Sequence, residues 1–156
     1  MLIYLDIDGV MVAANSWRRP NILDDGFAEF TPQAVKALNK ILEFPETSIV
    51  LTTSHKHHFS LDQWKEMFRI RNIDIENIQR LPENNENLNR KEELMLWFQK
   101  TEIKDHFIII DDDKSLNALS PYLKYRLIQT NASVGLTDHL ADQALTIMST
   151  LDMELI

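Results

Sequence analysis

Three short segments of this sequence are almost wholly apolar: residues 1–5, 48–51 and 107–110. A strand that is apolar on both faces belongs in the centre of a parallel sheet, where helices cover it on each side. A weaker run at residues 125–128 and a short segment within residues 75–81 are candidates for further strands. The sequence therefore predicts an α/β fold.

Helix signals lie between these runs. Alternation of strands and helices predicts a Rossmann-like, doubly wound parallel sheet with helices on both faces. We expect one domain over residues 1–156, in which the irregular residues 11–30 form a flap or minimal cap. The expected helix starts are Thr31 before Pro32, Ser60 with Gln63, Asn89 with Glu92, and Thr137.

The composition narrows the class of protein. The 156 residues include 16 basic and 24 acidic side chains, a net charge of −8, which argues against general nucleic-acid binding. The chain has no cysteine, which fits a reducing compartment. No apolar run approaches membrane-spanning length, and the apolar N-terminal run ends in acids rather than in a signal-peptide pattern. We expect a cytoplasmic protein without a membrane partner, and the sequence gives no oligomeric state.

Polar residues follow each of the three main apolar runs, and parallel strands bring their carboxyl ends to one edge of a sheet, where ligands bind. Basic residues also open the helix that precedes the third run. The groups expected at this edge are Asp6 and Asp8, Thr52, Thr53 and Ser54, Arg90 and Lys91, and Asp111, Asp112 and Asp113.

These residue types suit phosphoryl transfer. Converging carboxylates repel one another and need a cation, and hard oxygen ligands with room for water and phosphate suit Mg²⁺. Hydroxyl groups and a basic side chain hold phosphate oxygens. One carboxylate beside the metal is a plausible nucleophile at phosphorus, and a second is a plausible general acid and base.

The same residues resemble the motifs of the haloacid dehalogenase (HAD) superfamily. Residues 5–10, LDIDGV, look like its first motif, and the strand ending in Thr52, Thr53 and Ser54 resembles its second. Arg90 or Lys91 resembles the third, and residues 110–112, IDD, the fourth. The motifs occur in the family's order, and the resemblance covers residues 1 to about 145.

The resemblance implies a Mg²⁺-dependent phosphatase. Asp6 would attack phosphorus and form an aspartyl-phosphate, while Asp8 would protonate the leaving group and then activate water. The metal would be held by the Asp6 carboxylate, the Asp8 backbone carbonyl and Asp111, with Asp112 acting through water or hydrogen bonds. Asp8 matters because phosphatases of the superfamily carry this second acid, whereas the dehalogenases lack it.

Several phrases are similar to one branch, the HAD domain of multi-domain RNA-repair proteins. They are TS at 53–54, EELMLW at 92–97, DDD at 111–113 and GLT at 135–137. That branch often shows SSWR where this chain has TSHK at 53–56. We prefer Thr53 over Thr52 for the phosphate hydroxyl because Ser54 then matches the branch. The spacing to Leu94 favours Arg90 over Lys91, although lysine is commoner in the family.

The segments available for a cap are short: residues 11–30, and residues 56–89 with one helix and a short strand. An open site suits a large phosphorylated substrate, such as a nucleic-acid end, and a phosphorylated small molecule is the alternative. Residues 17–19, WRR, are either a flap that contacts substrate or a surface loop. The histidines of residues 55–58 are expected in a solvated loop, with one reaching the substrate edge as the alternative.

Two other functions fit parts of the pattern. A receiver-like phosphoacceptor also combines an α/β fold, acids and Mg²⁺, but its acidic pair comes first in the chain and its lysine last. A catalytically weak phosphate-binding module would keep the site without turnover. Steady phosphate release excludes both.

Overall fold

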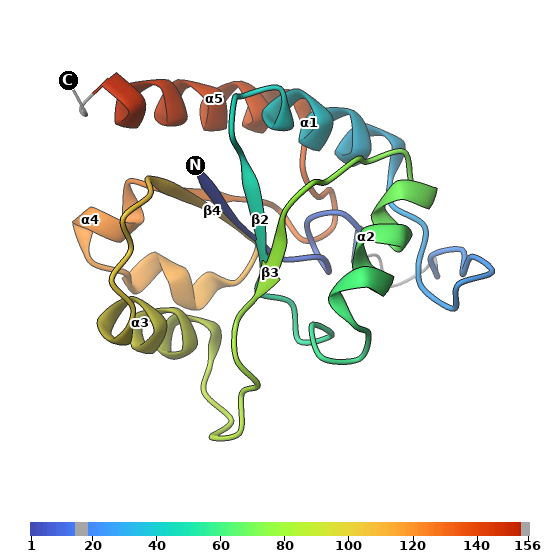
Figure 1. Ribbon diagram of the computed structural model, residues 1–156, viewed down its shortest axis with the longest axis horizontal. Helices are drawn as coiled ribbons and strands as arrows, with labels where there is room; N and C mark the ends of the chain where they lie inside the picture. Colours follow the sequence, from blue (N-terminus) through green and yellow to red (C-terminus); the bar gives the residue numbers. More distant parts are fainter. Residues whose placement is uncertain (15–18, 154–156) are drawn as a thin grey trace.

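The computed structural model describes residues 1–14 and 19–153, and its centre is a five-stranded parallel sheet of order β3-β2-β1-β4-β5 (Figure 1). The strands are β1 (Leu2–Leu5), β2 (Ser48–Leu51), β3 (Ile78–Arg80), β4 (Phe107–Asp111) and β5 (Leu127–Gln129). The longer helices are α1 (Pro32–Leu42), α2 (Leu61–Ile70), α3 (Arg90–Lys100) and α5 (Asp138–Met153). The predicted doubly wound α/β fold is confirmed.

Helices cover both faces because the central strands are apolar on both. In β1, Ile3 and Leu5 are fully buried in a core shared with α1, α2 and α5, whereas Tyr4 is buried in the core with α3 on the opposite face. Figure 1 shows α1 and α5 side by side along one face and α3 and α4 on the other.

The predicted helix starts are formed. Thr31 caps α1, with its side chain accepting a hydrogen bond from the backbone of Ala34. Ser60 with Gln63 and Asn89 with Glu92 form complete capping boxes at the starts of α2 and α3. These caps fix the first turns of the helices and hence which side chains enter the sheet edge.

Some boundaries differ from the expectation. The strand predicted at residues 125–128 is β5 at Leu127–Gln129, because residues 121–124 form the one-turn helix α4 (Pro121–Lys124). A 3₁₀ helix, η1 (Lys114–Ala118), also follows β4, and β4 itself extends to Asp111. Neither short helix carries enough residues for a periodic pattern.

There is no large cap in the described residues. Between β1 and α1 the chain forms turns and isolated bridges, and between α2 and α3 it forms only β3 and loops. The described residues therefore place no separate cap domain over the carboxyl edge of the sheet. No helix in the described part of the chain is long and apolar enough to span a membrane.

Candidate active site

Strand register brings the ends of β1, β2 and β4 together. Leu5 pairs with Leu51 on one side and with Ile110 on the other, so Asp6 lies between Thr52 and Asp111. The backbone holds this arrangement, because Asp6 N donates to the Ile110 carbonyl at 3.0 Å and Thr52 N donates to the Leu5 carbonyl at 3.0 Å. All three side chains are buried.

Three carboxylates form a compact acidic cluster at this edge. Asp6, Asp111 and Asp112 each offer an oxygen, and these oxygens lie within 4.8 Å of one another. The turn after β1 permits the approach of Asp112, because a Cβ on Gly9 would lie 2.3 Å from its Oδ2. Such an all-oxygen set fits a hard divalent cation such as Mg²⁺.

Burial and mutual repulsion shift the pKa values of two acids in the cluster. Burial, followed by the charge of Asp111, raises the pKa of Asp6 to about 8, although the Arg90 guanidinium opposes the shift. Burial also raises the pKa of Asp111. Added positive charge stabilises the ionised forms, so the acidic cluster favours a bound cation.

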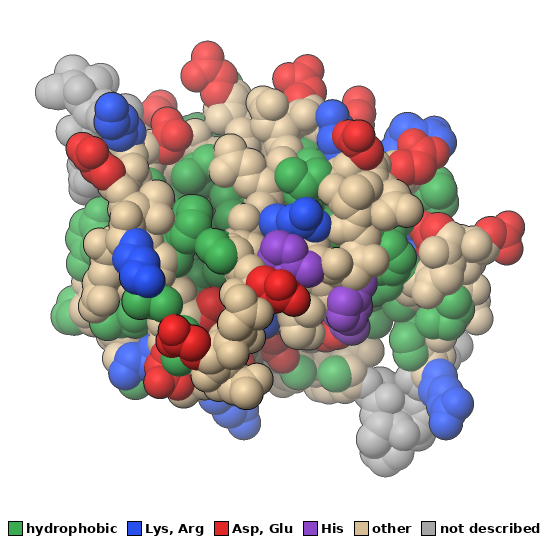
Figure 2. Space-filling view, turned by 60° about the horizontal axis from the view of Figure 1, so that its bottom comes forward, with side chains coloured by type: hydrophobic (Ala, Val, Ile, Leu, Met, Phe, Trp, Pro, Cys, Tyr) green, Lys and Arg blue, Asp and Glu red, His purple; other side chains and the backbone are tan. Residues whose placement is uncertain are grey.

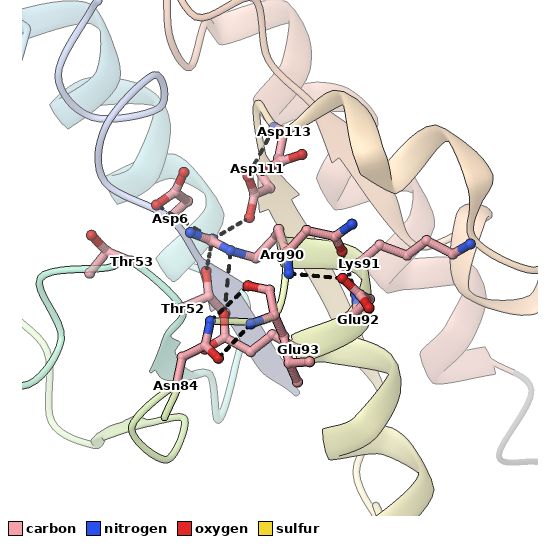
Figure 3. Close-up of polar contacts among 12 residues, drawn as sticks. Asp6, Thr52, Thr53, Asn84, Arg90, Lys91, Glu92, Glu93, Asp111 and Asp113 are labelled. Carbon is pink, nitrogen blue, oxygen red and sulfur yellow. Dashed lines mark hydrogen bonds and ion pairs between the residues drawn. The ribbon is translucent and has the colours of Figure 1, made fainter. Parts of the chain in front are cut away.

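Arg90 is the cation inside the site. Its Nη1 donates to Asp111 Oδ2 at 2.7 Å and to Thr52 Oγ1 at 3.0 Å, and it lies 3.6 Å from Asp6 Oδ1. Figure 3 shows the guanidinium between Asp6, Asp111 and Thr52, while the Lys91 side chain leads away from them. Of the two basic candidates, the structure brings Arg90 to the acidic cluster and directs the Lys91 side chain away from it (Figure 3).

The three hydroxyl residues after β2 differ in position. Thr52 Oγ1 is occupied by Arg90, and the buried Thr53 Oγ1 accepts a hydrogen bond from His55 N at 3.3 Å. Ser54 is exposed and lines a neighbouring cavity. Both threonines directly follow β2, at the same edge of the sheet as Asp6.

Asp8 and Asp113 lie outside the acidic cluster. Asp8 is exposed, and its Oδ2 is 2.8 Å from Nε2 of His55. Asp113 caps η1 by accepting a hydrogen bond from the backbone N–H of Ser115. Its own N–H donates to Asp111 Oδ1 at 3.0 Å, which fixes the orientation of that carboxylate.

A buried ion pair that the sequence did not point to supports Arg90. Glu93 accepts a hydrogen bond from Lys56 Nζ at 2.9 Å, and its other oxygen lies 3.6 Å from Arg90 Nε. Lys56 is 3% exposed. The sequence signal that could have indicated the contact of Glu93 with Arg90 is helical spacing, because Glu93 lies three residues after Arg90 and so shares its face of the helix.

A cavity of about 500 Å³ opens beside this network. Segments 54–58 and 83–93 line it, and it shares Ser54, Arg90 and Asp113 with the site. Its volume lies within the range of small-molecule binding sites. The described metal-capable acidic cluster includes no histidine, and His57 instead contacts the Leu81 carbonyl at 3.0 Å. Trp17 and Arg18 lie outside the described residues.

A doubly wound parallel sheet with this acidic cluster, a threonine and an arginine at its carboxyl edge defines a haloacid dehalogenase-type domain. More specifically, residues 2–141 match the family described as the HAD domain in Swiss Army Knife RNA repair proteins, and the chain belongs to that family.

No curated protein matches the sequence. Among solved structures, a crystal structure of a hypothetical protein from Xanthomonas campestris is similar, with 18% identity and a TM-score of 0.47. That match covers 99% of this chain and 86% of the other.

Proposed function

We propose that this protein is a Mg²⁺-dependent phosphomonoesterase that uses an aspartyl-phosphate intermediate. One observation carries the proposal: the buried carboxylate of Asp6 lies beside Arg90 and Thr52, and shares a compact acidic cluster with Asp111 and Asp112. This arrangement pairs a nucleophile with groups that bind phosphate oxygens.

The reaction follows in two steps. A carboxylate oxygen of Asp6 forms a bond to phosphorus while the ester P–O bond breaks, and Asp8 gives its proton to the departing alcohol oxygen. Asp8, now ionised, takes a proton from water, whose oxygen attacks phosphorus. The acyl-phosphate bond breaks, which releases inorganic phosphate and restores Asp6.

The remaining site residues would bind the phosphate and the metal. Arg90 is positioned to bind the phosphate as well as Asp111, with Thr53 and Thr52 as hydroxyl candidates. Asp6, Asp111 and Asp112, with the Asp8 backbone carbonyl, are the residues that would hold Mg²⁺. A bound Mg²⁺ supplies positive charge to the carboxylates and phosphate oxygens.

We further propose that the substrate is a phosphorylated nucleic-acid end. Membership in a family named for RNA repair proteins supports this class, as does the absence of a large cap over the described site. The net charge of −8 limits nonspecific binding along a nucleic-acid backbone, so recognition would concentrate on the terminus.

The test is phosphate release from an aryl phosphate, sugar phosphates, and oligonucleotides with 5′- or 3′-phosphates. Reactions contain Mg²⁺ or EDTA, and compare the wild type with Asp6→Asn. Asp74→Asn is the matched control, because this exposed acid lies near the amino ends of the strands.

Release that requires Mg²⁺ and Asp6 but not Asp74 supports the phosphatase. A large kcat/KM preference for small sugar phosphates overturns the nucleic-acid-end proposal but not the phosphatase. Absence of release from every substrate contradicts both, and favours a phosphate-binding module.

A further inference from the structure

His55 reaches the proposed general acid from a distant part of the chain. Its Nε2 lies 2.8 Å from Asp8 Oδ2, although the two residues are 47 positions apart. His55 belongs to a histidine-rich segment, residues 55–58, that the proposed function does not otherwise use. Figure 2 shows histidine side chains beside acidic and basic ones on the face at the bottom of Figure 1.

The chemistry of the two side chains determines which of them donates the hydrogen bond. Oδ2 of Asp8 accepts a hydrogen bond both in the ionised carboxylate and in an acid protonated on Oδ1, so Nε2 of His55 carries the hydrogen that is donated to it. His55 Nδ1 lies 3.3 Å from Nδ1 of His58, and in the neutral His55 ring that nitrogen accepts. Donation from His58 to His55 and from His55 to Asp8 therefore satisfies both contacts.

Packing holds the His55 ring in this orientation. Phe27 meets it edge to face, with centroids 5.6 Å apart, and the buried Phe27 packs in turn against Trp64 at 5.4 Å. Arg71 donates to the Phe27 carbonyl at 3.0 Å, and the backbone N–H of His55 donates to Thr53. Thus a rigid aromatic group supports an imidazole next to an otherwise exposed carboxylate.

We propose that His55 is a positioning residue for Asp8, an inference that rests on the phosphatase function proposed above. By occupying Oδ2, His55 fixes the carboxyl rotamer and leaves Oδ1 as the atom that gives its proton to the leaving oxygen. An unrestrained Asp8 would spend time turned into solvent, where it protonates no substrate.

This role predicts a dependence on the leaving group. A basic alkoxide needs its proton in the transition state, whereas an acidic phenolate departs without one. Loss of His55 should therefore lower kcat/KM for alkyl phosphates much more than for aryl phosphates with acidic phenols. The ratio kcat/KM is the appropriate quantity because it reports the steps up to leaving-group departure.

The experiment measures kcat/KM for both ester types in wild type, His55→Ala, His55→Gln, His55→Asn and Asp8→Asn. We expect His55→Ala to lower kcat/KM about tenfold or more for the alkyl ester and little for the aryl ester. The expected loss is a part of what general acid catalysis supplies. His55→Gln should restore kcat/KM for the alkyl ester, because the amide nitrogen of Gln reaches the position of Nε2. The shorter side chain in His55→Asn should not restore it. His139→Ala, a histidine change on α5, is the control.

The outcomes separate the two proposals. Equal losses on both esters in His55→Ala, with an active wild type, overturn the positioning role and leave the phosphatase intact. An inactive wild type overturns the phosphatase and this inference together. If His55→Ala does not fold, the Gln and Asn variants decide: equal leaving-group dependence in the two overturns the role.

Discussion

At the scale of single residues, Gly9 tests whether the acidic cluster depends on close packing of the first turn. Gly9 has a φ of 81° and Gly26 a φ of 82°, but of these two only Gly9 would place a Cβ against another residue, 2.3 Å from Asp112 Oδ2. Both Ala variants should lose about 1 kcal/mol of unfolding free energy from backbone strain.

Gly9→Ala should in addition displace Asp112 and weaken Mg²⁺ binding, which Gly26→Ala should leave unchanged. Calorimetric titration with Mg²⁺ and urea unfolding of both variants measure the two effects. Equal Mg²⁺ affinity in the two variants would mean that Asp112 does not contribute to the metal site.

Arg90 and Lys91 are adjacent in the sequence, and substituting each of them in turn separates their roles. Arg90→Lys should lower kcat/KM about tenfold or more, because one ammonium group cannot reproduce the planar contacts to Asp111 and Thr52. Lys91→Ala should change it less than about twofold, since that side chain leads away from Asp6 in Figure 3. Phosphate-release kinetics check both, and an equal loss would assign phosphate binding to both residues.

The sequence predicted some contacts of the site residues and missed others, and the reason is physical. The spacing of Arg90 to Leu94 indicated that both face the sheet, and the structure has Leu94 buried and Arg90 at the acidic cluster. Contacts such as His55 with Asp8 or Lys56 with Glu93 join loops to distant elements. The path of a loop depends on tertiary packing, which local patterns do not encode.

At the scale of elements, the caps were the most predictable features, because each is a short-range hydrogen-bond pattern. The capping boxes at α2 and α3 follow directly from residue types three positions apart. The short η1 and α4 were not predictable, since one turn shows no periodicity and its stability comes from packing of Leu116 and Leu123 against the core.

The two capping boxes provide a matched test of how α3 supports the site. Asn89→Ala and Ser60→Ala should each cost about 1 kcal/mol of unfolding free energy, because each frees a backbone N–H in the first helical turn. Only Asn89 directly precedes Arg90, so Asn89→Ala alone should also raise KM.

Thermal unfolding and phosphate-release kinetics of both capping variants measure these effects. A rise in KM of similar size in Ser60→Ala would indicate a general loss of stability rather than a displacement of Arg90.

At the scale of the whole molecule, the buried acids couple stability to pH and to metal. Carboxylates are usually ionised at neutral pH, but burial and the charge of Asp111 raise the pKa of Asp6 to about 8 in the folded, metal-free protein. The folded state therefore binds more protons than the unfolded state between about pH 4 and pH 8.

The sign of the pH effect follows from this difference. Asp6 contributes stability that is fully present below its unfolded pKa and is lost as pH rises through its folded pKa. Without metal, the free energy of unfolding should thus decrease between pH 6 and pH 8, by at most about 1.4 kcal/mol per pH unit for this one group. Asp111, whose pKa is also raised, acts in the same direction.

Mg²⁺ should reverse this trend, because the metal binds ionised carboxylates and its stabilising effect grows as pH rises. Urea unfolding at pH 6 and pH 8, in EDTA and in Mg²⁺, measures both effects for the wild type and Asp6→Asn. The variant lacks the titrating group at position 6, so its stability in EDTA should depend less on pH. A pH dependence identical to that of the wild type would show that Asp6 is already ionised in the metal-free fold, and that Arg90 alone balances the charge of the acidic cluster.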